Sequence, residues 1–140
     1  MTAPRGMHLR ACRLLGIDPS KVDLVGPAEY KRRSGHGVGC NWGITTRGSK
    51  PPYYYVRRTG RYVVYVHELL HILFPSRLHK WVFAAAWKLT KQHEYLDDWR
   101  DGRPYGRGGA LYADPVDAPE SRARIIQLAQ QAAHRKGLSP

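Results

Sequence analysis

The sequence predicts a single α+β domain, and three observations indicate that class. The chain has 140 residues, a length typical of one domain with its own core. Hydrophobic residues make up 42% of it and charged residues 24%, a balance typical of a globular protein. The segments follow the order helix, strands, helix pair, loop and helix, without an internal repeat. We therefore expect one domain over residues 1–140.

The N-terminal half is expected to contain one helix and three strands. Met7–Ile17 has apolar residues at helical spacing and ends near Gly16, which predicts a short helix. Lys21–Val25 and Val38–Thr46 are candidate strands. The strongest candidate is Tyr53–Arg58, which is aromatic and follows two prolines.

A pair of helices is expected next. Arg61–Phe74 reads as a helix despite its β-branched residues, and Pro75 ends it because proline disfavours helical geometry in the preceding residue. Ser76 can cap a second helix that runs to about Asp98 and has apolar faces.

The C-terminal part is expected to be a loop followed by a helix. Residues 101–116 are rich in glycine and proline, which predicts a long flexible loop. Asp117 and Glu120 have the spacing of a capping arrangement, with the carboxylate of Asp117 at the cap. Asp117 precedes a helix over about 118–136 that ends at Gly137, and Glu120 lies in its first turn.

Several classes of protein do not fit this sequence. Apolar runs such as Val82–Ala86 are far shorter than the roughly 20 residues that span a bilayer. Arg10 and Arg13 interrupt the N-terminal apolar stretch, unlike a secretory signal. Cys12 and Cys40 are too few for a disulfide framework, so we expect reduced cysteines in the core. These features predict a cytoplasmic protein that does not associate with membranes.

The net charge of +12 is unevenly distributed along the chain. Residues 1–66 hold 12 Lys or Arg and 3 Asp or Glu, whereas residues 67–140 hold 11 and 8. Lys31–Arg61 contains eight basic residues, no acid and several tyrosines. Because basic groups neutralise phosphates and aromatic rings stack on bases, this segment is a candidate nucleic-acid surface. A solvated basic face would account for the same charges. The candidate contacts are Arg57, Arg58 and Arg61.

The motif that carries chemistry is HExxH, formed by residues 67–71. Residues four apart lie on one face of a helix, so His67 and His71 can reach one Zn²⁺ ion. Glu68 lies about one residue's rotation away, where it can reach a water molecule rather than the metal. It is the only acid between Tyr62 and Phe74, and a carboxylate on an apolar helix is costly to bury without a role.

A catalytic zinc site needs a third protein ligand, and two candidates compete for that position. His79 follows His71 beyond a short turn, and a helix that doubles back passes the metal within its first turns. Glu94 forms an ExxxD pattern with Asp98, which resembles the second-helix motif of gluzincin peptidases. It lies 15 residues beyond His79, or about 22 Å along a helix. We favour His79. The remaining alternatives are Asp97, Asp98 and His93.

The segment from His67 to Phe83 resembles the minimal zincins of the SprT-like and WLM type. The resemblance covers roughly Tyr53–Trp87, about a quarter of the chain, with a longer gap before the third histidine than in the WLM pattern. It implies a zincin-like fold in which a small sheet packs on the HExxH helix and a following helix. It also implies that Glu68 is the general base. The implied zinc ligands are His67, His71 and His79.

These features together predict a zinc-dependent metallopeptidase that hydrolyses peptide bonds in a protein or peptide substrate. A nearby donor would stabilise the oxyanion, and the candidates are Tyr105, Tyr112, His93 and Arg77. The alternative is a basic nucleic-acid-binding module in which the HExxH site is structural or vestigial. A peptidase recruited to nucleic acid is compatible with both features.

Overall fold

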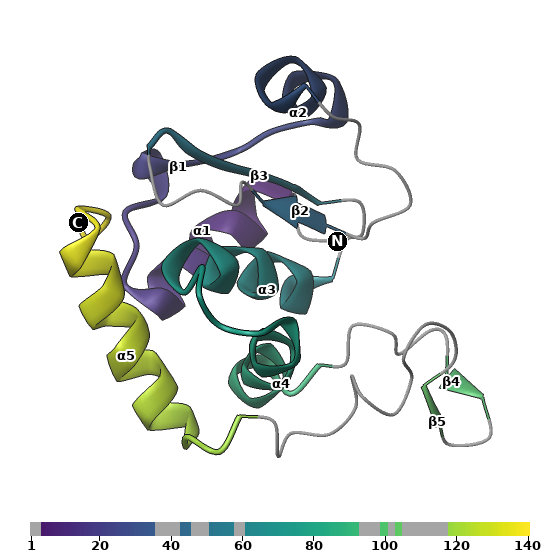
Figure 1. Ribbon diagram of the computed structural model, residues 1–140, viewed down its shortest axis with the longest axis vertical. Helices are drawn as coiled ribbons and strands as arrows, with labels where there is room; N and C mark the ends of the chain where they lie inside the picture. The colour runs from purple at the N-terminus through teal and green to yellow at the C-terminus, as the bar shows by residue number, and fades with distance from the viewer. Residues whose placement is uncertain are drawn as a thin grey trace.

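A computed structural model describes residues 4–35, 43–45, 51–57, 61–92, 99–100, 103–104 and 118–140 (Figure 1). These residues form an α+β fold, which confirms the predicted class. No helix among them combines the length and the apolar character needed to cross a membrane. The elements in chain order are α1 (Pro4–Leu15), the 3₁₀ helix η1 (Pro19–Lys21), β1 (Val22–Leu24), α2 (Pro27–Ser34), β2 (Gly43–Thr45), β3 (Tyr53–Arg57), α3 (Tyr62–Leu73), α4 (His79–Thr90), β4 (Trp99–Arg100), β5 (Arg103–Pro104) and α5 (Arg122–Arg135).

The main sheet is small and mixed, with the strand order β1-β3-β2. β1 pairs with β3 in parallel, with Val22 opposite Tyr53, and β2 pairs with β3 in antiparallel, with Ile44 opposite Val56. The sheet lies over α1 and α3, α4 lies on the other side of α3, and α2 lies beyond the sheet (Figure 1). β4 and β5 form a separate antiparallel pair.

Helix α3 is the centre of the core. It contacts the sheet, α1, α4 and α5, and every residue of it except His71 is buried. A largely apolar helix is stable when neighbours cover most of its faces, which is why this β-branched segment folds as a helix. Three small residues, Ala84, Ala85 and Ala86, are buried on the facing helix α4 and allow the two helices to pack closely.

Several predicted boundaries agree with the structure. α1 ends at Leu15, and the glycine after it, Gly16, has a φ of 74°, a left-handed conformation that favours glycine. β1 and β3 lie within their predicted ranges. Cys12 is a buried free thiol, as predicted, and burial raises its pKa to about 12. Residues 38–42 of the predicted strand and Cys40 lie outside the described residues.

Other boundaries were predicted wrongly. Ser76 does not cap α4, because the N-cap is Leu78 and the helix begins at His79. α4 also ends at Thr90 rather than near Asp98, since Lys91 adopts a left-handed φ of 57° and stops the helix. Helix α2 was not predicted, although the proline after Gly26 suits the first turn of a helix.

The last helix starts later than predicted. Ser121 is its N-cap and accepts a hydrogen bond from the backbone N–H of Arg124 at 3.2 Å, so the Asp117–Glu120 arrangement is not the cap. Its end agrees with the prediction, because Gly137 follows it with a φ of 71°. Most of the predicted loop over 101–116 lies outside the described residues, which include only β5 from it.

Candidate metal centre

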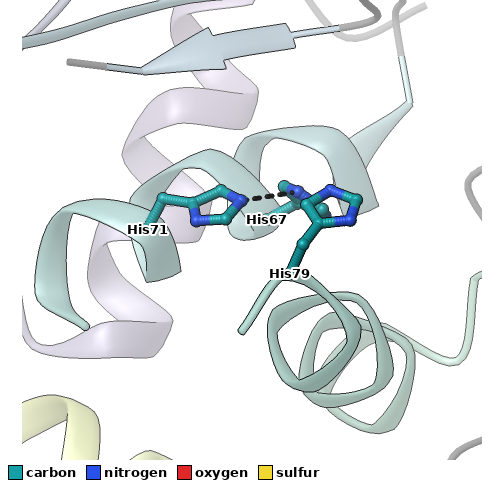
Figure 2. A group of neighbouring side chains, drawn as sticks. All are labelled: His67, His71 and His79. Carbon is teal, nitrogen blue, oxygen red and sulfur yellow. Dashed lines mark hydrogen bonds between the residues drawn. The ribbon is translucent and has the colours of Figure 1, made fainter. Parts of the chain in front are cut away.

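Three histidines from two helices converge on one point. His67 and His71 lie on the same face of α3, and His79 is the first residue of α4. Figure 2 shows the rings of His67 and His71 on α3 and of His79 on α4 gathered between the two helices. One ligand nitrogen from each ring can be chosen so that all lie within 4.8 Å of one another. The structure therefore brings together the three histidines that the sequence predicted as ligands.

The geometry of this group fits a metal ion. Nε2 of His67 and Nε2 of His71 are 3.0 Å apart. Two nitrogens bound to one tetrahedral zinc at 2.0–2.1 Å would be about 3.3 Å apart, so a small movement would seat an ion. The rings of His71 and His79 stack at an angle of 13°, with centroids 5.5 Å apart. Imidazole nitrogens suit zinc, copper, iron and nickel, so the donor set by itself leaves the metal open.

The three histidines differ in their exposure to solvent. His67 is buried with 3% of its surface exposed, His71 is partly buried, and His79 is exposed. His71 is also the one residue of α3 that is not buried. The centre is therefore closed on the side of His67 and open on the side of His79. A site with three protein ligands and one open side has the composition typical of a catalytic zinc site.

Glu68 lies on α3 directly after His67 and is 5% exposed. One residue corresponds to about 100° of rotation around a helix, so its carboxylate leaves α3 beside the histidines and not in line with them. In an HExxH helix, a carboxylate at this position can reach a water molecule near a metal rather than the metal itself. The role of Glu68 stays a prediction.

The rival ligands lie outside the described residues. Glu94, Asp97, Asp98 and His93 all fall within residues 93–98. A helix that continued through Glu94 would place it about 22 Å from His79, but α4 ends at Thr90. The distance along the helix therefore no longer counts against Glu94, and His79 is preferred because the structure places it beside His67 and His71.

Phe83 completes the buried side of the centre. It lies one turn after His79 on α4 and is 3% exposed. Its ring meets the ring of His67 edge-on, with centroids 6.3 Å apart and an angle of 87°, and lies 6.5 Å from that of His79. Phe83 falls within the predicted second helix, but no part in the site was expected for it. Its spacing of four residues from His79 is the signal that would have indicated it.

The beginning of each helix in the centre is held by a residue distant in sequence. The N-cap of α3, Arg61, makes no side-chain cap, but the N–H of Val63 donates to Oε1 of Gln92 at 3.0 Å. In the first turn of α4, the indole N–H of Trp81 donates to Oε1 of Glu120 at 2.9 Å. Such contacts orient the histidines through their backbone. Sequence analysis had no signal for either contact.

Arg77, a candidate oxyanion donor, has another set of contacts. Its guanidinium lies 4.5 Å from the centre of the Trp81 ring, and its Nη1 is 3.8 Å from Oε2 of Glu120. It is therefore engaged at the start of α4. The other candidate donors, Tyr105, Tyr112 and His93, lie outside the described residues.

The predicted nucleic-acid contacts are only partly described. Arg57 is the last residue of β3, Arg58 lies outside the described residues, and Arg61 is partly buried with a shielded Nε. On α2, Arg32 is paired with Glu29, and Nη1 of Arg33 is 3.0 Å from Oδ2 of Asp23. These acids neutralise part of the basic charge that led to the prediction.

Comparisons with known proteins found no match to this chain among family models, curated proteins or solved structures.

Proposed function

We propose that the chain is a zinc-dependent metallopeptidase with a zincin-like site. The observation that carries the proposal is the convergence of His67, His71 and His79 to within 4.8 Å, with Glu68 beside them on the same buried helix. The resemblance of this segment to SprT-like and WLM-type zincins and the small sheet over α3 support it. The three histidines would hold the ion, and the substrate would be a protein or a peptide.

The residues of the chain divide the chemistry between them. A bound zinc ion supplies Lewis acidity toward a carbonyl oxygen and toward water. His67 is fixed by burial and by the ring of Phe83, whereas the exposed His79 leaves a side through which a peptide can approach. Glu68 takes the proton from the attacking water and delivers it to the leaving amine nitrogen. Its buried carboxylate beside the histidines would perform both transfers without moving far.

The test combines metal analysis with an assay of proteolysis. The purified protein is expected to contain one zinc per chain and to cleave an unfolded protein such as casein, with activity lost to a chelator and restored by zinc. Glu68→Gln keeps the size of the side chain and is expected to keep the metal but lose about 10²–10⁴-fold in turnover.

Two results would contradict the proposal. A native protein that contains no zinc and binds none would exclude the metal site. A Glu68→Gln variant that cleaves as fast as the parent would show that Glu68 is not the base. His134→Gln, a substitution on the exposed side of α5, serves as the control and should change neither metal content nor cleavage.

A further inference from the structure

Two packed helices at the ends of the chain carry basic residues and no acid. α1 contains Arg5, Arg10 and Arg13, and α5 contains Arg122, Arg124 and Arg135. All six are exposed, and the two helices are in contact. This charge differs from that of α2, where Glu29 and Asp23 pair with the arginines. Within the described part of the chain, no acid pairs with Arg124 or Arg135.

The outer face of α5 consists of basic and amide side chains. We define it by four exposed residues at helical spacing: Arg124, Gln127, Gln131 and Arg135. Nη1 of Arg124 donates to Oε1 of Gln127 at 2.7 Å, so these two side chains extend in the same direction. Gln127, Gln131 and Arg135 also line an open hollow together with Gln130 and His134. Glutamine amides donate and accept hydrogen bonds, which suits this face to a polar partner.

This face continues onto α1. Gln130 covers Gly16 at the end of α1 so closely that a Cβ on Gly16 would lie 2.8 Å from its Cγ. Arg13 is exposed one turn before Gly16. Helix α5 stands at the edge of the molecule (Figure 1), and the four residues that define its outer face are exposed. It is therefore accessible to a large partner.

We propose that the outer face of α5 binds duplex nucleic acid in its major groove. Arg124 and Arg135 are 11 positions apart, which is about 16 Å along the helix and somewhat more than the ~12 Å width of that groove. The two arginines can thus reach phosphates on both sides, while Gln127 and Gln131 face the base edges between them. α5 contains no Phe, Tyr or Trp, so it offers no stacking platform for single strands.

The experiment measures binding of the full chain to a fluorescent 20-base-pair DNA duplex by anisotropy at several salt concentrations. The double variant Arg124→Gln/Arg135→Gln is expected to bind about tenfold or more weakly at 50 mM salt and to reduce the salt slope by about 2. The matched control, Lys31→Gln/Arg32→Gln, removes the same charge from α2 and is expected to bind like the parent. Circular dichroism of both variants checks that they are folded.

Three results would overturn the proposal. The parent chain could fail to bind the duplex at 50 mM salt. The α2 control could lose as much affinity as the α5 variant, which would assign binding to the basic 31–61 segment or to net charge rather than to the outer face of α5. Polyglutamate could compete as well as DNA, which would indicate an acidic protein as the partner. Because Glu68→Gln retains this face, its DNA binding is expected to equal that of the parent, so failure here is distinct from failure of the proposed peptidase.

Discussion

The indole of Trp81 and the carboxylate of Glu120 join α4 to the segment that leads into α5, with 2.9 Å between Nε1 and Oε1. Arg77 adds a stacked guanidinium on the Trp81 ring, and Nζ of Lys88 donates to the backbone oxygen of Glu120 at 2.9 Å. Burial alone would raise the pKa of Glu120, but the bond from Trp81 and the nearby cations outweigh it and hold the pKa below its ordinary value. His79 lies in the same turn as Trp81, so this contact supports the third ligand.

Removal of the Glu120 carboxylate is expected to destabilise the protein. In Glu120→Ala the buried indole N–H of Trp81 loses its acceptor, so the free energy of unfolding should fall by about 1–3 kcal/mol. Glu120→Gln retains an acceptor oxygen and should lose less than half as much. Urea unfolding of both variants measures the difference. Equal losses would show that the hydrogen bond to Trp81 contributes little.

The three histidines are expected to contribute unequally to metal affinity. His67→Ala and His71→Ala should abolish tight zinc binding, because each removes one of the two nitrogens already held 3.0 Å apart on α3. His79→Ala should weaken affinity by a large factor, because an exposed ligand on a second helix is lost. Competition with a zinc chelator measures these affinities.

Glu94→Ala is the matched test of the rival ligand. If His79 is the third ligand, this variant should bind zinc like the parent. If instead Glu94→Ala binds zinc weakly and His79→Ala binds it like the parent, Glu94 is the third ligand and the proposed site is wrong.

A buried histidine is expected to make stability depend on pH. Nε2 of His8 donates to the backbone oxygen of Pro19 at 3.1 Å, and Nδ1 accepts from the hydroxyl of Tyr55 at 2.6 Å, which assigns a neutral ring. Burial lowers the pKa of His8, and nearby Arg5 adds to this effect, while the Pro19 bond and Asp23 oppose it. The buried thiol of Cys12 also faces the ring at 3.8 Å.

The sign follows from the unfolded state, where His8 regains its ordinary pKa of 6.5. As pH falls through that value, the unfolded chain binds a proton that the folded chain does not, so stability falls. The slope from this residue is at most about 1.4 kcal/mol per pH unit, and it vanishes below the lowered folded pKa. Urea unfolding at pH 7.5 and 5.5 should show a smaller pH difference in His8→Phe than in the parent. A chelator is present throughout, so that metal binding does not change the measured stability. His134→Gln is the control and should show the same pH difference as the parent.

Two glycines with left-handed backbones give a matched pair of substitutions. Gly137→Ala places a Cβ in open space, so only the backbone conformation opposes it, at about 1–2 kcal/mol. Gly16→Ala also places its new Cβ 2.8 Å from Cγ of Gln130, so it should lower the free energy of unfolding by more. Thermal or urea unfolding ranks the two. Gly26→Ala, which meets nothing within 4 Å and has no positive φ, is the control.

Local sequence patterns predicted the fold class, the strands β1 and β3 and the helix pair, because each depends on neighbours in the chain. Gly16 and Gly137 marked helix ends that require a left-handed residue. The spacing of His67 and His71 predicted that their side chains lie together for the same reason, since helical geometry alone places them on one face. His79 required only the further assumption of a short turn between α3 and α4.

The remaining features depend on contacts between distant residues. Ser76 has a side chain that can cap a helix, but Leu78 is the N-cap and α4 begins at His79. The left-handed conformation of Lys91 ends α4. Nothing in the sequence indicates it, because lysine rarely adopts a positive φ. The contacts of Trp81 with Glu120 and of Val63 with Gln92 join residues 39 and 29 apart, beyond the reach of periodicity.

The position of α3 between both ends of the chain has a consequence for synthesis on the ribosome. α1 and α5 both pack against α3, and the N–H of Asp18 donates to the backbone oxygen of Leu138 at 2.6 Å. Because translation delivers the N-terminal helix first, α3 emerges before the partner that closes its core. The chain can complete its core only after residue 138 has left the ribosome. The faces of α3 that α5 covers therefore stay exposed until α5 itself has been synthesised.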